Sequence, residues 1–247
     1  MSRTVSIVVS SFVAVALHVV VAGSAFAQDP PAVEPSAAEP PSNQPPPVAQ
    51  QTAASAGSVF DLPGFDFGAR LGYALPMGNA DADSKLSDGI SGAIPIVLEA
   101  GYRINPNLTV GALFQYGIAR IKDSTTCNTS GVDCSGSVMR LGVEAIYNLN
   151  LDSPLSPWVG VGTGYEWFGT SVSAGGQSAS VTAKGFEFVT LHAGGDYRLA
   201  PNFALGPFLS FSVGQYGSVS TPNGGGDITD KGIHEWIQLG VRGRFGI

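Results

Sequence analysis

The sequence predicts an all-β protein, an eight-stranded antiparallel up-and-down transmembrane β-barrel. Three observations support this prediction. Eight segments alternate apolar residues with polar residues or glycine, their connections are alternately long and short, and a secretory leader precedes them. Because successive residues of a strand point to opposite sides of a sheet, each segment has one apolar face and one charged, glycine-rich face. A barrel that turns its apolar face outward meets lipid rather than water.

Residues 1–27 have the pattern of a signal peptide. Arg3 supplies a positive charge, residues 5–22 are mostly apolar, and residues 25–27 (Ala-Phe-Ala) form the small-x-small cleavage pattern. The apolar stretch approaches the length of a membrane anchor, but several serines and a histidine interrupt it. We therefore expect a signal peptide that is cleaved after residue 27, and an exported protein.

Residues 28–57 form a proline-rich segment with eight of the 17 prolines of the chain. Such a composition cannot bury a core and favours extended polyproline conformations. We expect a disordered periplasmic segment; the alternative is a tether toward the cell wall, with a reach of about 90 Å at about 3.1 Å per residue.

The barrel domain is expected over residues 58–247, and each of its strands is long enough to cross a bilayer when tilted. The eight strands are predicted at residues 64–75, 93–103, 108–119, 137–148, 158–167, 186–199, 203–215 and 234–245. Three connections are short and rich in turn residues, at 105–107, 148–157 and 200–202. The other four are expected to be loops of about 17 or 18 residues, rich in Gly, Ser, Thr, Asp and Asn. An even number of strands places both ends of the barrel domain on the short-turn side, which faces the periplasm.

A soluble barrel would show the same alternation, so three further features are needed to place the apolar face outside. Glycines crowd the opposite face, which suits a narrow lumen, and the lysines fall in predicted loops. Aromatic residues collect on the apolar face at the short-turn end, as a membrane-interface girdle requires. This predicted girdle consists of Phe65, Tyr102, Tyr147, Tyr197 and Phe245.

The polar face predicts a network of charges in the lumen. An eight-stranded barrel is only wide enough for side chains to fill, and charges buried without partners would be costly. We expect Arg140 opposite Glu166, Arg70 near Glu99, and Asp66 near Arg242 or Arg244, with Trp158, Phe188, Phe208 and Trp236 filling the space between them. Structural plugging is favoured; the alternative is a narrow, gated water path. The predicted network comprises Asp66, Arg70, Glu99, Arg103, Arg140, Glu144, Glu166, Asp196, Arg198 and Arg242.

Cys127 and Cys134 are the only cysteines and lie in a polar segment, which in an exported protein predicts a disulfide. A metal site is disfavoured because no histidine lies nearby in the sequence. Closing so short a loop is worth roughly 2 to 3 kcal/mol on the chain-entropy model. Asp81, Asp83 and Asp88 lack the spacing of a calcium loop. We expect no metal and no cofactor.

The charge of the chain argues against nucleic acid as a partner. The formal net charge is −7, and removal of the leader, which holds Arg3 and no acid, leaves 11 basic and 19 acidic residues, a net charge of −8. There is no basic run that would form a phosphate-binding surface.

Residues 58–247 resemble the small eight-stranded outer-membrane β-barrel domains of Gram-negative bacteria, the OmpA/OmpX-type group. The resemblance is carried by residues 98–107, 157–162, 194–198 and the closing strand, 239–245. It implies location in the cell outer membrane, contact with outer-membrane lipid, and insertion by the barrel-assembly machinery. In this group the last residue is commonly aromatic, whereas here Gly246 and Ile247 follow Phe245. We expect a monomer.

Three functions remain open, and a structural or surface-interaction role through the extracellular loops is favoured. An extracellular or cell-wall partner would then exist, which the sequence does not name. The alternative is a narrow, porin-like channel for small solutes. A lipid-modifying enzyme is third, because the mature chain offers only His192 and His234 as bases, and His192 lacks the His-x-Ser pair of the small lipid A deacylases. We therefore expect no enzymatic activity.

Overall fold

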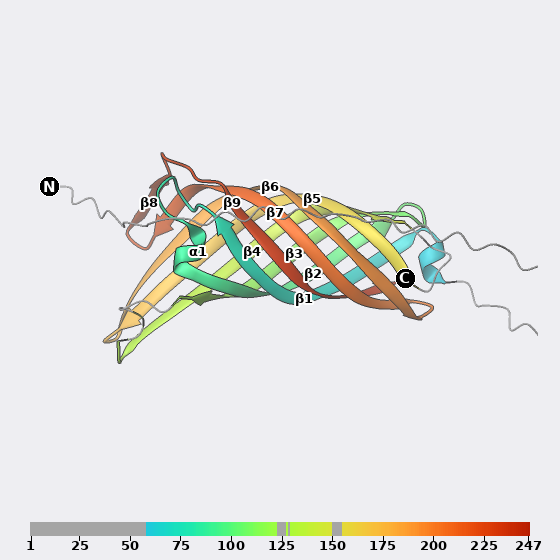
Figure 1. Cartoon of the computed structure of the whole chain (residues 1–247), viewed down its shortest axis with the longest axis horizontal. Helices are drawn as coiled ribbons and strands as arrows, with labels where there is room; N and C mark the ends of the chain where they lie inside the picture. Colours follow the sequence, from blue (N-terminus) through green and yellow to red (C-terminus); the bar gives the residue numbers. More distant parts are fainter. Residues whose placement is uncertain (1–57, 123–126, 128, 150–154) are drawn as a thin grey trace, which may run out of the picture. The chain divides into compact units, whose positions relative to one another are not determined.

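The computed structural model describes residues 58–122, 127, 129–149 and 155–247; the predicted signal peptide and proline-rich segment lie outside them. The described part contains a 3₁₀-helix, one short α-helix and nine strands (Figure 1). In chain order these are η1 (Val59–Asp61), β1 (Gly64–Gly78), α1 (Leu86–Gly89), β2 (Ile90–Arg103), β3 (Leu108–Ile121), β4 (Val132–Asn148), β5 (Leu155–Ala174), β6 (Gln177–Ala200), β7 (Phe203–Thr221), β8 (Gly224–Asp227) and β9 (His234–Gly246).

Eight of these strands close into an antiparallel barrel, which confirms the predicted fold class. Strands β1 to β7 pair in sequence, β7 pairs with β9, and β9 pairs with β1 to close the ring. The short strand β8 pairs with β7 outside this ring. Figure 1 shows η1 and the C-terminus at one end of the barrel, and α1 and β8 at the other. We call these the turn end and the loop end.

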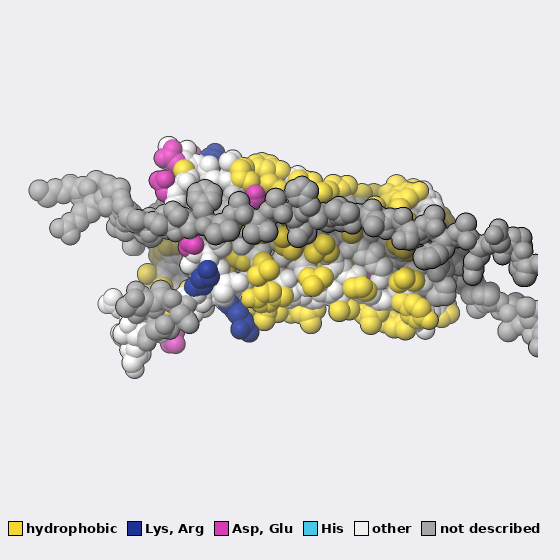
Figure 2. All heavy atoms as spheres, in the orientation of Figure 1, with side chains coloured by type: hydrophobic (Ala, Val, Ile, Leu, Met, Phe, Trp, Pro, Cys, Tyr) yellow, Lys and Arg dark blue, Asp and Glu magenta, His cyan; other side chains and the backbone are white. Residues whose placement is uncertain are grey.

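The apolar face points outward. Leu98, Leu141 and Leu239 are 55%, 56% and 63% exposed, whereas Asp66 and Arg70 are 4% and 2% exposed. Figure 2 shows the resulting apolar belt around the side of the barrel, with charged side chains gathered at the loop end. A soluble barrel would have the opposite distribution, so this surface is suited to lipid. Among the described residues, no helix is long and apolar enough to cross a membrane.

In the short turn between β2 and β3, asparagine side chains form hydrogen bonds with the backbone. Between β2 and β3, Oδ1 of Asn105 accepts hydrogen bonds from the backbone N–H groups of Asn107 and Leu108, both at 3.0 Å. Nδ2 of Asn107 donates to the carbonyl oxygen of Asn148 at 2.8 Å, which ties this turn to the end of β4. Such side-chain to backbone bonds are the reason that Asn favours turns.

The predicted loop lengths of about 17 or 18 residues were too long. The connections β1–β2, β3–β4 and β7–β9 comprise only residues 79–89, 122–131 and 222–233, and the largest difference is in the connection between β5 and β6. These strands extend well beyond the predicted 158–167 and 186–199, and they meet at Gly175 and Gly176, whose φ angles are +57° and +80°. Two consecutive positive φ angles fit a two-residue type I′ hairpin turn. The Ser, Ala and Gly residues in this segment resemble a loop in composition, yet they pair across the hairpin from Thr170↔Val181 to Ala174↔Gln177.

Candidate functional site

The lumen is closed at the turn end by Phe60 of η1. Its ring is 3% exposed and lies beneath two guanidinium groups, 4.4 Å from that of Arg244 and 5.5 Å from that of Arg103. The backbone N–H of Val59 donates to the carbonyl oxygen of Pro201 at 3.0 Å. Nη2 of Arg103 donates to the carbonyl oxygen of Val59 at 2.9 Å. These bonds hold η1 across the opening.

Phe60 is a plug that the strand pattern does not reveal, because it precedes the first strand and takes no part in the alternation. The only signal in the sequence is an aromatic residue in a short, turn-rich segment directly before β1. Asp66 forms ion pairs with both of these arginines: it pairs with Arg103, and its Oδ2 lies 3.1 Å from Nη2 of Arg244. The structure thus places Asp66 beside Arg244, one of the two partners that the sequence suggested.

The middle of the lumen holds a connected set of ion pairs. Arg242 contacts Glu99 (Nε to Oε2, 3.0 Å) and Asp196 (Nη1 to Oδ2, 3.0 Å). Arg70 pairs with Glu99, and its Nη2 lies 2.9 Å from Oε2 of Glu144. These residues come from β1, β2, β4, β6 and β9, so the network crosses the barrel from wall to wall. Each carboxylate has an arginine partner, which offsets the cost of burying the charges.

Trp158 fills the space between these ion pairs. Its Nε1 donates to Oδ1 of Asp196 at 2.9 Å, and its ring lies 4.6 Å from the guanidinium of Arg242. A cavity in the lumen at this level, lined by Glu99, Glu144 and Arg242 among others, has a volume of about 10 Å³. That volume holds about one water molecule.

A second group of charges lies nearer the loop end. Nε of Arg140 lies 2.6 Å from Oε2 of Glu166 and 2.9 Å from Oε2 of Glu187. The hydroxyl of Tyr216 donates to Glu166, and the ring of His234 stacks on Tyr216 with centroids 4.0 Å apart. The structure therefore brings Arg140 and Glu166 together, as the hairpin register suggested, and adds Glu187, which the sequence pattern missed.

The sequence pattern missed Glu187 because the inward and outward positions of β6 exchange at a bulge. Phe188, which was expected in the lumen, is 49% exposed on the outer face, and Glu187 is 6% exposed inside. The pairing of β6 with β7 shifts register between Glu187 and Val189, and β5 shifts between Gly162 and Gly164. A bulge of this kind reverses the faces on one side of it, so strict alternation cannot predict both halves of the strand.

Arg198 is the member of the predicted network that lies at the rim. Its Nη2 is 3.3 Å from Oδ1 of Asp61, and the two side chains are 19% and 45% exposed. The five predicted girdle aromatics are between 41% and 57% exposed, and the rings of Phe65 and Tyr102 pack edge to face with centroids 5.3 Å apart.

The loop end of the lumen is covered by an apolar layer. Leu86 of α1, Ile90, Val138, Tyr216 and Trp236 belong to one buried cluster there. The lumen is thus filled by side chains from Phe60 at the turn end, through the ion pairs, to this layer.

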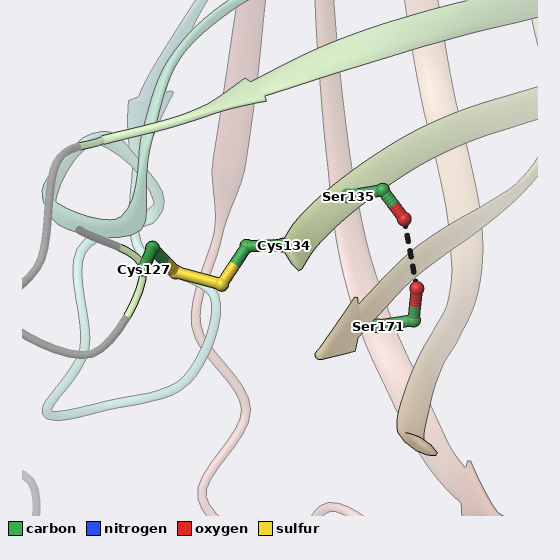
Figure 3. Close-up of a disulfide and its surroundings, with 4 residues drawn as sticks. All are labelled: Cys127, Cys134, Ser135 and Ser171. Carbon is green, nitrogen blue, oxygen red and sulfur yellow. Dashed lines mark hydrogen bonds between the residues drawn. A yellow bond between two sulfur atoms is a disulfide. The ribbon is translucent and has the colours of Figure 1, made fainter. Parts of the chain in front are cut away.

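Above this layer lies an open apolar cup, which we call the vestibule. It has a volume of about 330 Å³ and is lined by Leu86, Ile90, Ile121, Phe168, Val172 and both cysteines, among others. The predicted disulfide between Cys127 and Cys134 is confirmed, with Cα atoms 5.7 Å apart (Figure 3). Beside it, the hydroxyls of Ser135 and Ser171 lie 2.7 Å apart and join β4 to β5.

The histidines belong to the packed lumen rather than to an open site. Nδ1 of His192 lies 3.0 Å from Nη1 of Arg70, and its Nε2 lies 3.5 Å from Oε2 of Glu144. His234 is 1% exposed and stacks on Tyr216 of the apolar layer. Within the described ranges, no three His, Cys, Asp or Glu side chains are grouped as metal ligands would be.

The family model for the outer membrane protein beta-barrel domain matches residues 48–245 of the chain. No curated protein sequence matches this chain. Among solved structures, Neisserial surface protein A (NspA) is 19% identical, with 74% of this chain and 97% of NspA covered and a TM-score of 0.48. Ail of Yersinia pestis is 17% identical (74% and 99% covered, TM-score 0.43), and OprG of Pseudomonas aeruginosa is 14% identical (76% and 99% covered, TM-score 0.41).

Proposed function

We propose that this chain, which belongs to the outer membrane protein beta-barrel domain family, is a surface-interaction protein of the outer membrane. In this proposal the barrel is a rigid support, and the loop end binds the partner. Short turns face the periplasm and longer connections face outward in outer-membrane barrels, so the loop end is the extracellular end.

The observation that carries this proposal is the filled lumen. Phe60 and two arginines close the turn end, ion pairs cross the middle, and the apolar layer around Leu86 and Trp236 closes the loop end. A conducting path would require several of these buried contacts to break together. The filled lumen therefore favours surface interaction over the alternative of a narrow channel.

The loop end, in contrast, carries structure beyond what closing a barrel requires. β5 and β6 continue as a paired hairpin to the turn at Gly175 and Gly176. The end of β7 and the short strand β8 form a second antiparallel hairpin. A disulfide and a hydrogen bond between two serines brace the β4 side of the vestibule. Surfaces ordered before binding lose less entropy when they bind, which suits a recognition surface.

An enzymatic role receives less support from the geometry. Among the described residues, His192 and His234 are both buried, and their rings contact arginine, glutamate and tyrosine side chains of the lumen. A lipid substrate would have to reach one of them through the packed layer or through the barrel wall. We therefore place the interaction role first and the channel second.

Adhesion of cells that display the full chain tests the proposal. A variant in which residues 171–180 are replaced by an Asn-Gly turn shortens the β5–β6 hairpin at the Thr170↔Val181 pair. The matched control replaces Pro201 and Asn202, at the turn end, with the same dipeptide. We expect the first change to lower adhesion to cell-coated or matrix-coated surfaces and the second to leave it unchanged, with both proteins keeping a heat-dependent gel shift.

Planar bilayer recordings provide the second arm of this test. We expect no steady unit conductance from the full chain at high protein load. Steady conductance, together with adhesion that survives shortening of each extracellular connection in turn, would reject the proposal in favour of the channel.

A further inference from the structure

We propose that Tyr73, Ser91, Arg120 and Lys122 form a binding site for the anionic headgroup of an outer-leaflet lipid. These residues lie on β1, β2 and β3 and directly after β3, on the outer wall of the barrel near its loop end. The site faces outward beside the vestibule, with which its cavity shares Ile121 and the two cysteines as lining residues.

The outward-facing side chains of β3 change from apolar to basic between one outward position and the next. Phe114, Tyr116 and Ile118 face outward and are 41%, 49% and 61% exposed, and the next two outward residues, Arg120 and Lys122, are exposed as well. Alternate residues of a strand are about 6.8 Å apart, so the first charge lies directly above the apolar belt. Figure 2 shows Lys and Arg side chains at this margin of the belt. Basic residues directly above the apolar belt of a membrane barrel are expected at the level of the lipid headgroups.

Gly92 gives the site its shape. It lies opposite Arg120 in the pairing of β2 with β3, and a Cβ atom at this position would collide with the ring of Tyr73. The ring therefore lies over Gly92, and its hydroxyl donates to the carbonyl oxygen of Ser91 at 3.4 Å. The hydroxyl of Ser91 in turn donates to the carbonyl oxygen of Arg120 at 3.2 Å. A chain of hydrogen bonds thus joins three neighbouring strands and ends at the backbone of Arg120.

Arg120 differs from every other arginine that the structure describes. The other six each form an ion pair with a carboxylate, five of them inside the lumen and Arg198 at the turn end. Within the described ranges, the guanidinium of Arg120 has no carboxylate partner. A cavity of about 650 Å³ lies beside it, and its lining includes Ser91, Arg120, Lys122 and Asp133, together with Ile121 and the two cysteines.

The chemistry of the site favours a phosphorylated lipid as the occupant. A guanidinium presents paired N–H groups that match phosphate oxygens, and Lys122 adds a second positive charge in a chain whose net charge is negative. Ile118 and Ile96, 61% and 53% exposed, lie on the belt below and offer a surface for the acyl chains. A free phosphate ion would gain the charge contacts but not this apolar contact. Basic residues at a membrane interface attract anionic headgroups in this way.

Native mass spectrometry of the detergent-purified full chain tests the site. The probes are a bisphosphorylated glycolipid and its dephosphorylated form with the same acyl chains. We expect the chain to prefer the phosphorylated probe, and Arg120→Gln and Lys122→Gln each to reduce that preference about fivefold at low salt. Tyr73→Phe removes only the hydroxyl and should cause a smaller reduction.

Lys231→Gln is the matched control, because it removes the same charge from an exposed position of the loop end. It should leave the preference unchanged. An equal reduction in this control would show a general charge effect and overturn the site, and so would an unchanged preference in Arg120→Gln. Inorganic phosphate in excess should compete weakly; full competition would mean a free anion site and would also overturn the proposal. A heat-dependent gel shift confirms that each variant is folded.

Discussion

The lumen and the outer wall at the loop end handle charge in opposite ways. In the lumen, the arginines of β1, β2, β4 and β9 are each at most 6% exposed and paired with carboxylates. At the loop end, Arg120 and Lys122 are exposed at the margin of the apolar belt. Charges of the first kind hold the barrel together, because removing one partner leaves a buried charge uncompensated. Charges of the second kind contribute little to folding and are available for binding.

Arg242→Met should be the most damaging change. It removes the partner that lies 3.0 Å from both Glu99 and Asp196, and it leaves two buried carboxylates with fewer donors. We expect the free energy of unfolding in lipid vesicles, measured by urea titration, to fall by about 3 to 5 kcal/mol. Arg120→Met, the same substitution on the outer wall, should change it by less than about 0.5 kcal/mol. Equal losses would remove the distinction between the two kinds of charge.

Phe60→Ala tests whether the turn-end plug is part of the folded barrel. The change removes a ring that is 3% exposed and lies beneath Arg103 and Arg244, and we expect a loss of about 3 kcal/mol. Bilayer recordings of this variant should still show no steady conductance, because the ion pairs and the apolar layer around Trp236 remain. Steady conductance would mean that Phe60 alone closes the barrel, and it would strengthen the channel alternative.

Cys127→Ser with Cys134→Ser should affect the loop end and spare the barrel. The disulfide closes a loop of sequence separation 7, which is worth at most about 2 to 3 kcal/mol on the chain-entropy model. We expect the heat-dependent gel shift to be unchanged and cleavage by trypsin after Lys122 to become faster. The full chain treated with a reductant should behave like the double variant. A lost gel shift would show that the disulfide supports the barrel as well.

The sequence could predict the features of the barrel that depend on the alternation of apolar and polar residues along each strand. Pairs such as Arg140 with Glu166 follow from the hairpin register, and they lie where the pattern suggested. Phe188 was placed on the wrong face because a bulge is a local change of register that composition does not signal. The contacts of Phe60 could not be predicted, because Arg103 and Arg244 meet around it only after the ring of strands has closed. The Tyr73–Gly92–Arg120 arrangement lies on three consecutive strands, but it depends on a register shift between Ile90 and Gly92 that strict alternation does not predict.

Gly176→Ala should have the smallest effect, confined to the tip of the β5–β6 hairpin. Gly176 has a φ of +80°, a conformation that favours glycine, so we expect a cost of about 1 kcal/mol. Gly175→Asn is the matched control, because Asn tolerates the first position of a type I′ turn, where φ is +57°. Hydrogen exchange should quicken near Val172 and Ala179 in the first variant only, since these residues pair close to the turn. Faster exchange that reached the pair of Val143 and Thr163, far from the tip, would show that the hairpin and the barrel wall form one cooperative unit, and the separation of a supporting barrel from a binding end would then fail.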